Sequence, residues 1–250
     1  MQEMIRVDNL EKIFYSQSYM EIKALTEVNL SVPGNEFLCI LGPSGCGKST
    51  LLRIIAGLET ASSGKVFYNG QEHTKPRREI GMVFQSYSLM PWLTVLDNIA
   101  LGLEFAGLSR PKRISIAEEY LDMIGMNSFG KAFPYELSGG MQQRVAIARA
   151  LANNPEVLLM DEPFGALDAY TRIVMQKELL RIWEQHKKTI LFVTHSVDEA
   201  VYLGDRIILM SGSPGRIKKD IAITMPRVRE RRNPLYGKLT EELLALLEEA

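Results

Sequence analysis

Residues 42–50 carry the clearest chemical signal in the chain. Glycines lack a Cβ atom, so a glycine-rich loop can fold its backbone N–H groups around an anion, and the free N–H groups of a following helix add to the same site. In the pattern G-x-x-x-x-G-K-[ST] the lysine reaches the β- and γ-phosphates and the hydroxyl is a ligand of Mg²⁺. This pattern predicts a nucleoside triphosphate site. The pattern and the residue that follows it comprise Gly42, Pro43, Ser44, Gly45, Cys46, Gly47, Lys48, Ser49 and Thr50.

A second helix start has an unusual composition. Ser138 precedes Gly139 and Gly140, and apolar residues then recur at helical spacing until Asn153-Asn154-Pro155. Serine is a good N-cap, whereas each glycine disfavours a helix by up to about 1 kcal/mol. Two glycines in a first turn indicate that another group approaches the N–H groups closely. We expect a second anion site at this helix start.

Two carboxylates follow a fully apolar run. Residues 157–160 read Val-Leu-Leu-Met and are followed by Asp161 and Glu162. Carboxylates at the end of a buried strand are costly unless a cation or hydrogen bonds meet them. Asp161 suits the Mg²⁺ partner of the phosphate loop, and Glu162 suits a base that orients a water molecule on the γ-phosphate.

Two further polar residues stand directly after buried strands. Gln85 follows residues 80–84, and His195 follows residues 189–194. Each has a plainer interpretation, Gln85 as a solvated loop residue and His195 as a structural histidine. Because ligands bind at the carboxyl ends of parallel strands, we expect both at the ligand edge, with His195 near the γ-phosphate. His73 and His186 have polar neighbours in the sequence and are interpreted as surface residues.

The elements that must position these residues indicate an α/β fold. Short apolar strands alternate with helices, residues 4–15 and 24–32 alternate as antiparallel strands do, and residues 86–136 change to helical spacing. We predict a P-loop NTPase fold with a mostly parallel sheet core, an antiparallel β subdomain and an inserted helical subdomain. The predicted single domain, 1–250, divides into a core with the antiparallel subdomain (about 1–85 and 156–225), a helical subdomain (about 86–155) and a tail helix (about 226–250).

Composition limits the possible functions. The 250 residues are 46% hydrophobic and 24% charged, which is ordinary for a globular chain with a sizeable core. The formal net charge of −1 gives no reason to expect a nucleic-acid partner. The two cysteines make no disulfide or metal framework and suggest a reducing, cytosolic environment. No run of about 18 apolar residues occurs, and the N-terminus lacks the apolar core of a signal peptide. Any role at a membrane would therefore come through a partner.

The last 25 residues have a pattern of their own. Four arginines are most simply a solvated face, and a contact with acidic lipid or protein is the alternative. A leucine stripe after them predicts a small docking helix. The arginines are Arg227, Arg229, Arg231 and Arg232, and the stripe is Leu235, Leu239, Leu243 and Leu246 or Leu247.

Taken together, the motifs resemble those of the ATP-binding subunit of ABC transporters over nearly the whole chain. Residues 137–142, Leu-Ser-Gly-Gly-Met-Gln, are similar to the LSGGQ signature of that family, with methionine where glutamine is usual. Residues 42–50 match Walker A, 157–161 Walker B, and 165–168 the D-loop. Glu162 matches the catalytic glutamate, Gln85 the Q-loop glutamine and His195 the switch histidine. The adenine-stacking aromatic aligns best with Phe14, and Tyr15 is the alternative.

The resemblance implies roles for these residues. Catalysis would fall to Glu162, His195, Lys48 and Gln85, and Mg²⁺ would be held by Ser49, Gln85 and Asp161. ATP would be bound by Phe14, residues 42–50, and, from the signature and D-loop, Ser138, Gly139, Gly140, Gln142 and Asp168.

The resemblance also implies partners. Two copies of the chain would enclose two ATP molecules and pass their closure, through the region of residues 85–98, to membrane permease subunits and indirectly to a solute-binding protein. Such a subunit lies peripherally on the cytoplasmic face of the membrane. Residues 89–98 are similar to those of nitrate, sulfonate and taurine importers.

Two other readings remain at this point. One is an ABC ATPase of a different importer or an ABC protein without a transport role. ABC proteins of DNA repair have long coiled-coil insertions and those of translation usually have a second cassette, and the sequence contains neither. The other is a nucleotide sensor without turnover, which would not need Glu162 beside Asp161.

Overall fold

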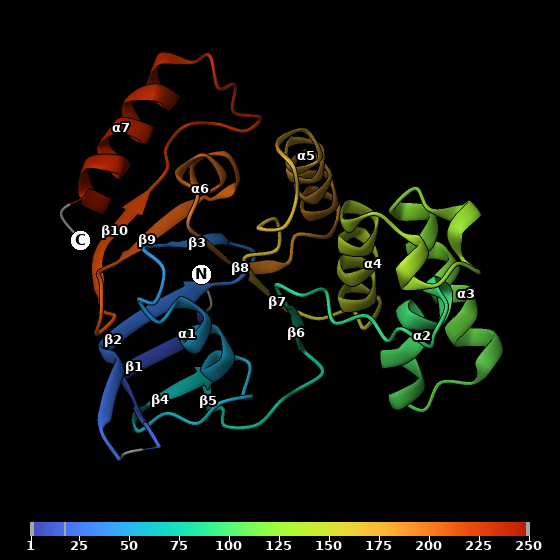
Figure 1. Ribbon diagram of the computed structural model, residues 1–250, viewed down its shortest axis with the longest axis horizontal. Helices are drawn as coiled ribbons and strands as arrows, with labels where there is room; N and C mark the ends of the chain where they lie inside the picture. The colour runs from blue at the N-terminus through green and yellow to red at the C-terminus, as the bar shows by residue number, and fades with distance from the viewer. Residues whose placement is uncertain (1–2, 18, 249–250) are drawn as a thin grey trace. The chain divides into compact units, whose positions relative to one another are not determined.

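A computed structural model describes residues 3–17 and 19–248. The chain forms two compact units, residues 1–77 with 183–250 and residues 78–182. Figure 1 gives the position of each labelled element along the chain.

The first unit contains an antiparallel sheet. Its strands alternate between buried and more exposed residues, as expected where one face of a sheet packs on the core. The expected antiparallel strands over residues 4–15 and 24–32 are both present in this sheet. In the strand order β2-β1-β4-β5 its members are β1 (Glu3–Tyr15), β2 (Glu21–Pro33), β4 (Ser63–Tyr68) and β5 (Gln71–Glu72).

A second group of strands in the first unit carries the phosphate loop. β3 lies between β8 and β9 and runs parallel to both, and β10 pairs antiparallel with β9. Every residue of β3 and β8 is buried, which explains their continuous apolar sequence, because parallel strands are covered on both faces. The strands are β3 (Phe37–Leu41), β8 (Thr189–Thr194), β9 (Arg206–Met210) and β10 (Ile217–Ala222). The helices of this unit are α1 (Lys48–Ile55), α6 (Val197–Leu203) and α7 (Pro234–Glu248).

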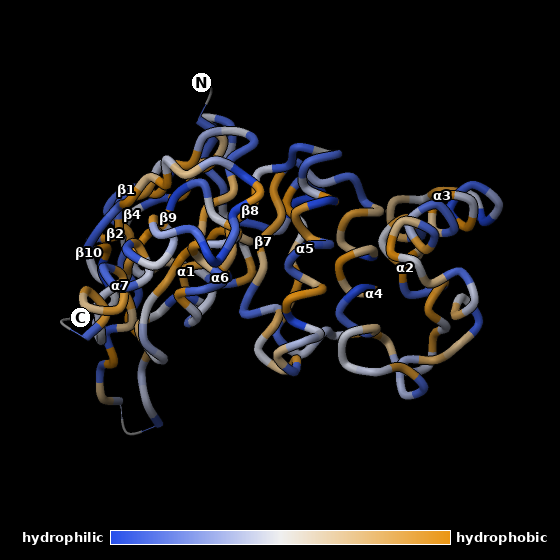
Figure 2. The backbone as a smooth tube through the Cα atoms, turned by 90° about the horizontal axis from the view of Figure 1, so that it is seen from above, coloured by the Kyte–Doolittle hydropathy of each residue, from blue (hydrophilic) through white to orange (hydrophobic). Residues whose placement is uncertain are grey.

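The second unit joins a parallel strand pair to helices. β6 (Ile80–Val83) and β7 (Val157–Asp161) are parallel. A hydrophobic core joins α2, α3 and α4, and it includes the predicted stripe residues Val95, Ile99 and Leu103. Hydrophobic and hydrophilic residues alternate along α4 and α5 in Figure 2. The helices are α2 (Val95–Phe105), α3 (Arg110–Met123), α4 (Gly139–Ala152) and the greater part of α5 (Ala169–His186), whose residues from 183 onward belong to the first unit. Single 3₁₀ turns lie at Asn127–Phe129 and Pro134–Glu136.

The expected surface position of His73 is wrong. Its residue is only 2% exposed, and the imidazole packs edge-on against Tyr68 with 6.4 Å between ring centroids. Burial lowers the pKa of the His73 imidazole. The polar neighbours of His73 misled the prediction, because Gln71, Glu72 and Thr74 are exposed whereas the side chain of His73 is buried. The side chain of His186 lies outside the described part of the structure.

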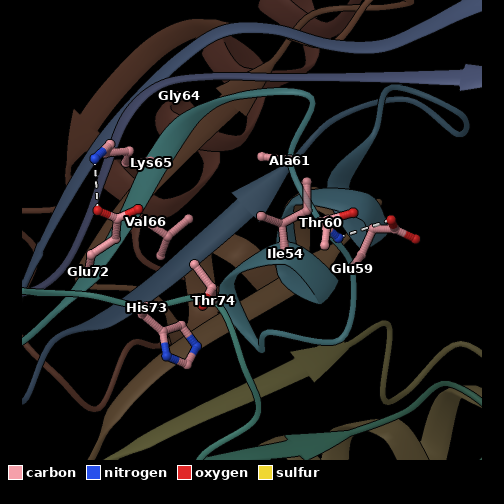
Figure 3. Close-up of a pocket in the computed structure, with 10 residues that line it drawn as sticks. All are labelled: Ile54, Glu59, Thr60, Ala61, Gly64, Lys65, Val66, Glu72, His73 and Thr74. Atoms are coloured by element: carbon pink, nitrogen blue, oxygen red, sulfur yellow. Dashed lines mark hydrogen bonds and ion pairs between the residues drawn. The ribbon is translucent and has the colours of Figure 1, made fainter.

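His73 also lines a cavity of about 230 Å³ between the last turn of α1 and β4 (Figure 3). A Lys65–Glu72 ion pair of 2.8 Å stands at its rim. Glu59 on the opposite wall pairs with Lys12 at 2.7 Å. The ten lining residues that the structure describes are outside the predicted phosphate loop, so the cavity is separate from the predicted nucleotide contacts.

The prediction of a solvated arginine face is wrong for two of the four tail arginines. Arg229 is 3% exposed, and the guanidinium carbon of Arg227 lies 4.2 Å from the ring centroid of Trp183. Arg231 pairs with Asp198, whereas the side chain of Arg232 is 85% exposed. In the predicted leucine stripe, Leu243 is fully buried. The tail therefore binds its own unit.

Within residues 3–17 and 19–248, no helix combines the length and apolar character needed to cross a membrane.

Asn98 anchors the loop before α2. Its fully buried amide accepts a hydrogen bond from the Met90 N–H at 2.8 Å and donates to the carbonyls of Met90, Leu93 and Thr94 at 3.0–3.1 Å. We expect Asn98→Ala to lower the free energy of unfolding by about 2–3 kcal/mol, because one N–H and three carbonyls each lose a hydrogen bond to the side chain.

Urea denaturation measures this loss. The matched control is Asn127→Ala in the same unit, where an exposed amide bonds to Asp122 and the loss should stay below about 1 kcal/mol. Equal losses in the two variants would contradict the anchoring role of Asn98.

Candidate active site

The predicted phosphate loop folds as its glycines require. Gly45 and Gly47 have φ values of 81° and 90°, the left-handed region that residues with a Cβ rarely adopt. A Cβ at Gly47 would also lie 2.6 Å from Leu25 Cδ2, and one at Gly42 would lie 2.9 Å from Cys46 Sγ. The loop therefore needs glycine both for its backbone conformation and for its close packing.

Lys48 begins α1 and its side chain folds back over the loop. The buried ammonium donates to the carbonyls of Gly42 at 2.8 Å and Pro43 at 2.9 Å. An ammonium has three N–H donors, so it can exchange a carbonyl for a phosphate oxygen without leaving the loop. Burial raises the pKa of the neighbouring Cys46 thiol, which is therefore neutral at neutral pH and does not offset the positive charge.

The pairing of β3 with β8 brings His195 and the phosphate loop to one edge. Leu41, the last residue of β3, is paired with Thr194, the last residue of β8. Gly42 and His195 follow directly, so both leave the sheet at the carboxyl ends of adjacent parallel strands. His195 is exposed there. This is the predicted edge of the sheet, and contact of His195 with a γ-phosphate stays a prediction.

The two candidate aromatics lie at the end of β1. Phe14 is 37% exposed, and the Lys12 ammonium lies 4.7 Å from its ring centroid. Tyr15 is 64% exposed. The contact of either ring with adenine stays a prediction.

In the second unit, Gln85, Asp161 and Glu162 converge. Val83 is paired with Met160 in the parallel β6–β7 ladder, so the residues that follow each strand leave the same edge. Asp161 is buried at the end of β7. Gln85 Nε2 lies 3.5 Å from Glu162 Oε2. Glu162 adopts a φ of 43°, a left-handed conformation that costs a residue with a Cβ about 1–2 kcal/mol.

The helix start at Ser138 is capped as expected. The Ser138 hydroxyl accepts a hydrogen bond from the Met141 N–H at 3.4 Å. Gly139 is exposed in the first turn of α4. Gly140 is buried, and a Cβ there would lie 2.6 Å from Thr171 Cγ2. The second glycine therefore has a packing reason that the sequence did not reveal, and Gly139 leaves the start of the helix open.

Gln142 and Asp168 also have local roles. Gln142 Nε2 donates to the carbonyls of Pro134 and Leu137 at 3.0 and 3.2 Å, which holds the turn before α4. Asp168 accepts from the Thr171 N–H at 3.0 Å, and hydrogen bonds with Thr171 lower the pKa of its carboxyl. Contacts of Gln142 and Asp168 with a nucleotide stay predictions.

Arg149 is a residue that the sequence reasoning missed. From α4 its guanidinium donates to the carbonyls of Ser88 at 2.6 Å and Tyr87 at 2.8 Å, in the loop that begins at Gln85. Tyr87 and Ser88 have φ values of 58° and 50°, so this partly buried cation holds two left-handed residues in place. The only available signal was a cation within the apolar run of α4.

The donor chemistry fits ATP and Mg²⁺. A glycine loop, a lysine and two helix N-termini suit phosphate oxygens. Ser49 offers a hydroxyl, Gln85 an amide oxygen and Asp161 a carboxylate, and Mg²⁺ prefers oxygen ligands of this kind. The candidates belong to two sets, with residues 42–50 and His195 on the first unit and Gln85, Ser138, Asp161 and Glu162 on the second.

The chain is similar to proteins of known families. The model of the ABC transporter family matches residues 25–165. An uncharacterized ABC transporter ATP-binding protein of Methanocaldococcus jannaschii is 52% identical, covering all of this chain and 93% of the relative. A taurine import ATP-binding protein of Rhizobium johnstonii is 45% identical, covering 98% of this chain and 96% of the relative. A nitrate import ATP-binding protein of a Synechocystis strain is 44% identical, covering 97% of this chain and 94% of the relative.

Solved structures agree with these relatives. A dimeric structure of a bacterial ABC transporter cassette has a TM-score of 0.79 and 38% identity, covering 91% of this chain and all of the other. A dimeric post-hydrolysis state of that ATP-binding cassette, bound to ADP and phosphate, has a TM-score of 0.78 and 37% identity, with the same coverage. The predicted α/β fold, with parallel strands, an antiparallel sheet and helices, is thereby confirmed.

Arg149→Met should loosen the loop that carries Gln85. We expect the amides of residues 86–89 to exchange hydrogen at least about tenfold faster, because two carbonyls lose a charged donor that fixes them. Arg149→Lys should give an intermediate rate, since one ammonium cannot match the planar fork of a guanidinium. Hydrogen-exchange mass spectrometry measures both.

The matched control is Arg110→Met, which removes an exposed arginine from α3 of the same unit. Its exchange rates at residues 86–89 should equal those of the unmodified chain. Unchanged exchange in Arg149→Met would refute the role of Arg149 in holding the loop.

Proposed function

The chain belongs to the ABC transporter family and is an ATPase of that family, and on this premise we propose that it powers an importer of a small solute such as taurine, nitrate or a sulfonate. The names of its relatives support the solute class. We further propose that two copies of this ATP-binding subunit close as a dimer and that their closure is coupled to permease subunits.

One observation carries the catalytic part of the proposal. Glu162 follows the buried Asp161, in a left-handed conformation, with its carboxylate 3.5 Å from Gln85 Nε2. A carboxylate beside an amide suits the acceptance of a proton from a water molecule that the amide also orients. A binding protein without turnover would not need this strained pair.

The proposed reaction is phosphoryl transfer to water. As the water oxygen bonds to the γ-phosphorus, the bond from that phosphorus to the bridging oxygen breaks, and ADP leaves. Glu162 accepts the proton of the water, and Lys48 and the loop N–H groups balance the charge on the phosphate oxygens. His195 donates to the γ-phosphate from the end of β8. Mg²⁺, held by Ser49, Gln85 and Asp161, supplies further charge neutralisation when bound.

The second half of each site is proposed to come from another copy of the chain. Ser138 and Gly139 offer an exposed helix start on α4, where N–H groups and the helix dipole favour an anion. The dimeric cassette structures support this arrangement. ATP would thus close two copies around two nucleotides, and hydrolysis would release them.

The permease is proposed to contact the segment between Gln85 and Asn98. Trp92 is exposed in that segment, and Asn98 fixes the backbone on either side of it. A fixed loop with an exposed indole suits a protein partner, because Trp is enriched at the energetic centres of interfaces. The chain would then lie on the cytoplasmic face of the membrane, beside a permease served by a solute-binding protein.

Glu162→Gln should keep ATP binding and stop turnover. The amide cannot accept the proton of water, so we expect phosphate release to fall by roughly 10²–10⁴-fold while an ATP-bound dimer accumulates. Steady-state phosphate release and light scattering after size exclusion measure the two effects. Glu156→Gln, which removes an exposed carboxylate just before β7, is the control. A variant at 162 that hydrolyses ATP normally and stays monomeric would refute the assignment.

Ser138→Arg should abolish turnover without loss of ATP binding to the monomer. The long cation would fill the helix start that receives the nucleotide of the other copy, while residues 42–50 are unchanged. Titration with a fluorescent ATP analogue, together with phosphate release, separates the two properties. Ser115→Arg on the exposed face of α3 controls for added charge. Loss of binding in the Ser138 variant, in step with turnover, would place Ser138 in the site of its own chain.

A further inference from the structure

The tail arginines hold α6, the helix that follows His195. Arg229 donates to the carbonyls of Val201 at 2.9 Å, Tyr202 at 3.2 Å and Gly204 at 2.6 Å, and to that of Met225 at 3.1 Å. The last carbonyls of a helix have no partner within the helix. The buried Arg229 guanidinium supplies the missing donor, and its positive charge suits the negative end of the helix dipole. Burial lowers the pKa of Arg229.

The tail also holds the first turn of α6. Both Asp198 carboxylate oxygens accept hydrogen bonds from Arg231 at 2.7 Å. The Tyr236 hydroxyl, from α7, lies 2.7 Å from Asp198 Oδ1 and 2.9 Å from its carbonyl oxygen. The Arg231 guanidinium further packs 4.5 Å from the ring centroid of Tyr202. α7 lies beside α6 in Figure 1, so both ends of α6 are bound by residues of the tail.

α6 depends on contacts with the rest of its unit. It has only seven residues, and isolated helices shorter than about 12 residues are marginal in water. Its buried residues Val197, Ala200 and Val201 pack on the core. The contacts with Arg229, Arg231 and Tyr236 fix it from the tail side.

A short rigid connection joins α6 to His195. Ser196 is the N-cap of α6, and its hydroxyl accepts from the Glu199 N–H at 3.4 Å. The Ser196 N–H donates to Thr194 Oγ1 at 3.0 Å, and the Thr194 hydroxyl donates a hydrogen bond to the Glu199 carboxylate. His195 stands between Thr194 and Ser196, so a displacement of α6 changes the backbone at His195.

We propose that Arg229, Arg231 and Tyr236 are positioning residues that aim His195 at the reacting phosphate by clamping α6. This inference rests on the proposed role of His195 in hydrolysis. It gives the tail a function within its own chain, in place of the solvated face or membrane contact that its arginine content indicated.

The test removes the clamp on the first turn of α6 through the double variant Arg231→Ala and Tyr236→Phe. Arg231 is partly exposed and Tyr236→Phe keeps the ring, so this variant should fold. We expect kcat for ATP to fall by about tenfold while the Kd for ATP stays within about twofold, because misplacing a reacting group slows chemistry more than it weakens binding. Arg232→Ala is the matched control, since it removes an exposed tail arginine that forms an ion pair with the exposed Glu230 and does not contact α6 in the described part of the structure.

A second readout follows the imidazole directly and needs no ATP. The chain has three histidines, so ¹³C-labelled histidine gives three ring signals in an NMR spectrum, and His195→Ala identifies that of His195. We expect the clamp variant to shift or broaden the His195 signal and to leave that of His73, buried against Tyr68 of β4, unchanged. An altered His73 signal would mean general unfolding of the unit and would count against the proposal.

Two results would overturn the inference. One is an unchanged His195 signal in the clamp variant, and the other is a loss of ATP affinity as large as the loss of kcat. A different result would locate the failure in the proposed function instead. If the His195 signal moves, but neither the clamp variant nor His195→Ala lowers kcat, then the clamp exists and His195 has no part in hydrolysis.

Discussion

The register of parallel strands is the constraint on which the site depends. Leu41 pairs with Thr194 in the first unit, and Val83 pairs with Met160 in the second. The strands cannot slide freely, because a shift by one residue would move every side chain to the opposite face, and both faces are closely packed. The polar residue after each strand therefore emerges at a fixed edge. Lys48 and His195 in the first unit, and Gln85 and Glu162 in the second, owe their positions to this pairing.

Guanidinium groups that are buried or partly buried hold the segments next to these strand ends. Arg149 bonds two carbonyls of the loop after Gln85, and Arg229 bonds three carbonyls at the end of α6. Each has a pKa lowered by burial, and each bonds chiefly to backbone carbonyls. Carbonyls accept from a cation without neutralising it, so one arginine can fix several residues of irregular backbone. Loops and a seven-residue helix thereby gain the order that regular secondary structure does not supply.

Glycine serves two different purposes in the motifs. Gly45 and Gly47 adopt left-handed backbone conformations, and a Cβ at Gly47 would also clash with Leu25. Gly140 has no such conformation and is needed because Thr171 packs where its Cβ would be. Gly139, beside it, is exposed and leaves the start of α4 accessible. A motif rich in glycine thus combines residues that shape a site with residues that only pack it.

The sequence by itself determined the phosphate loop, the helix start at Ser138, the carboxylates Asp161 and Glu162 and the α/β fold, because spacing and apolar periodicity act over a few residues. Only the tertiary structure decided that His73 is buried, that Gln142 supports a turn, and that Arg149 and Arg229 hold distant backbone. The same charged or polar side chain can face water or cap a carbonyl far along the chain, and only packing distinguishes the two. Local pattern thus predicted which residues could do chemistry, and long-range contacts decided which residues hold them in place.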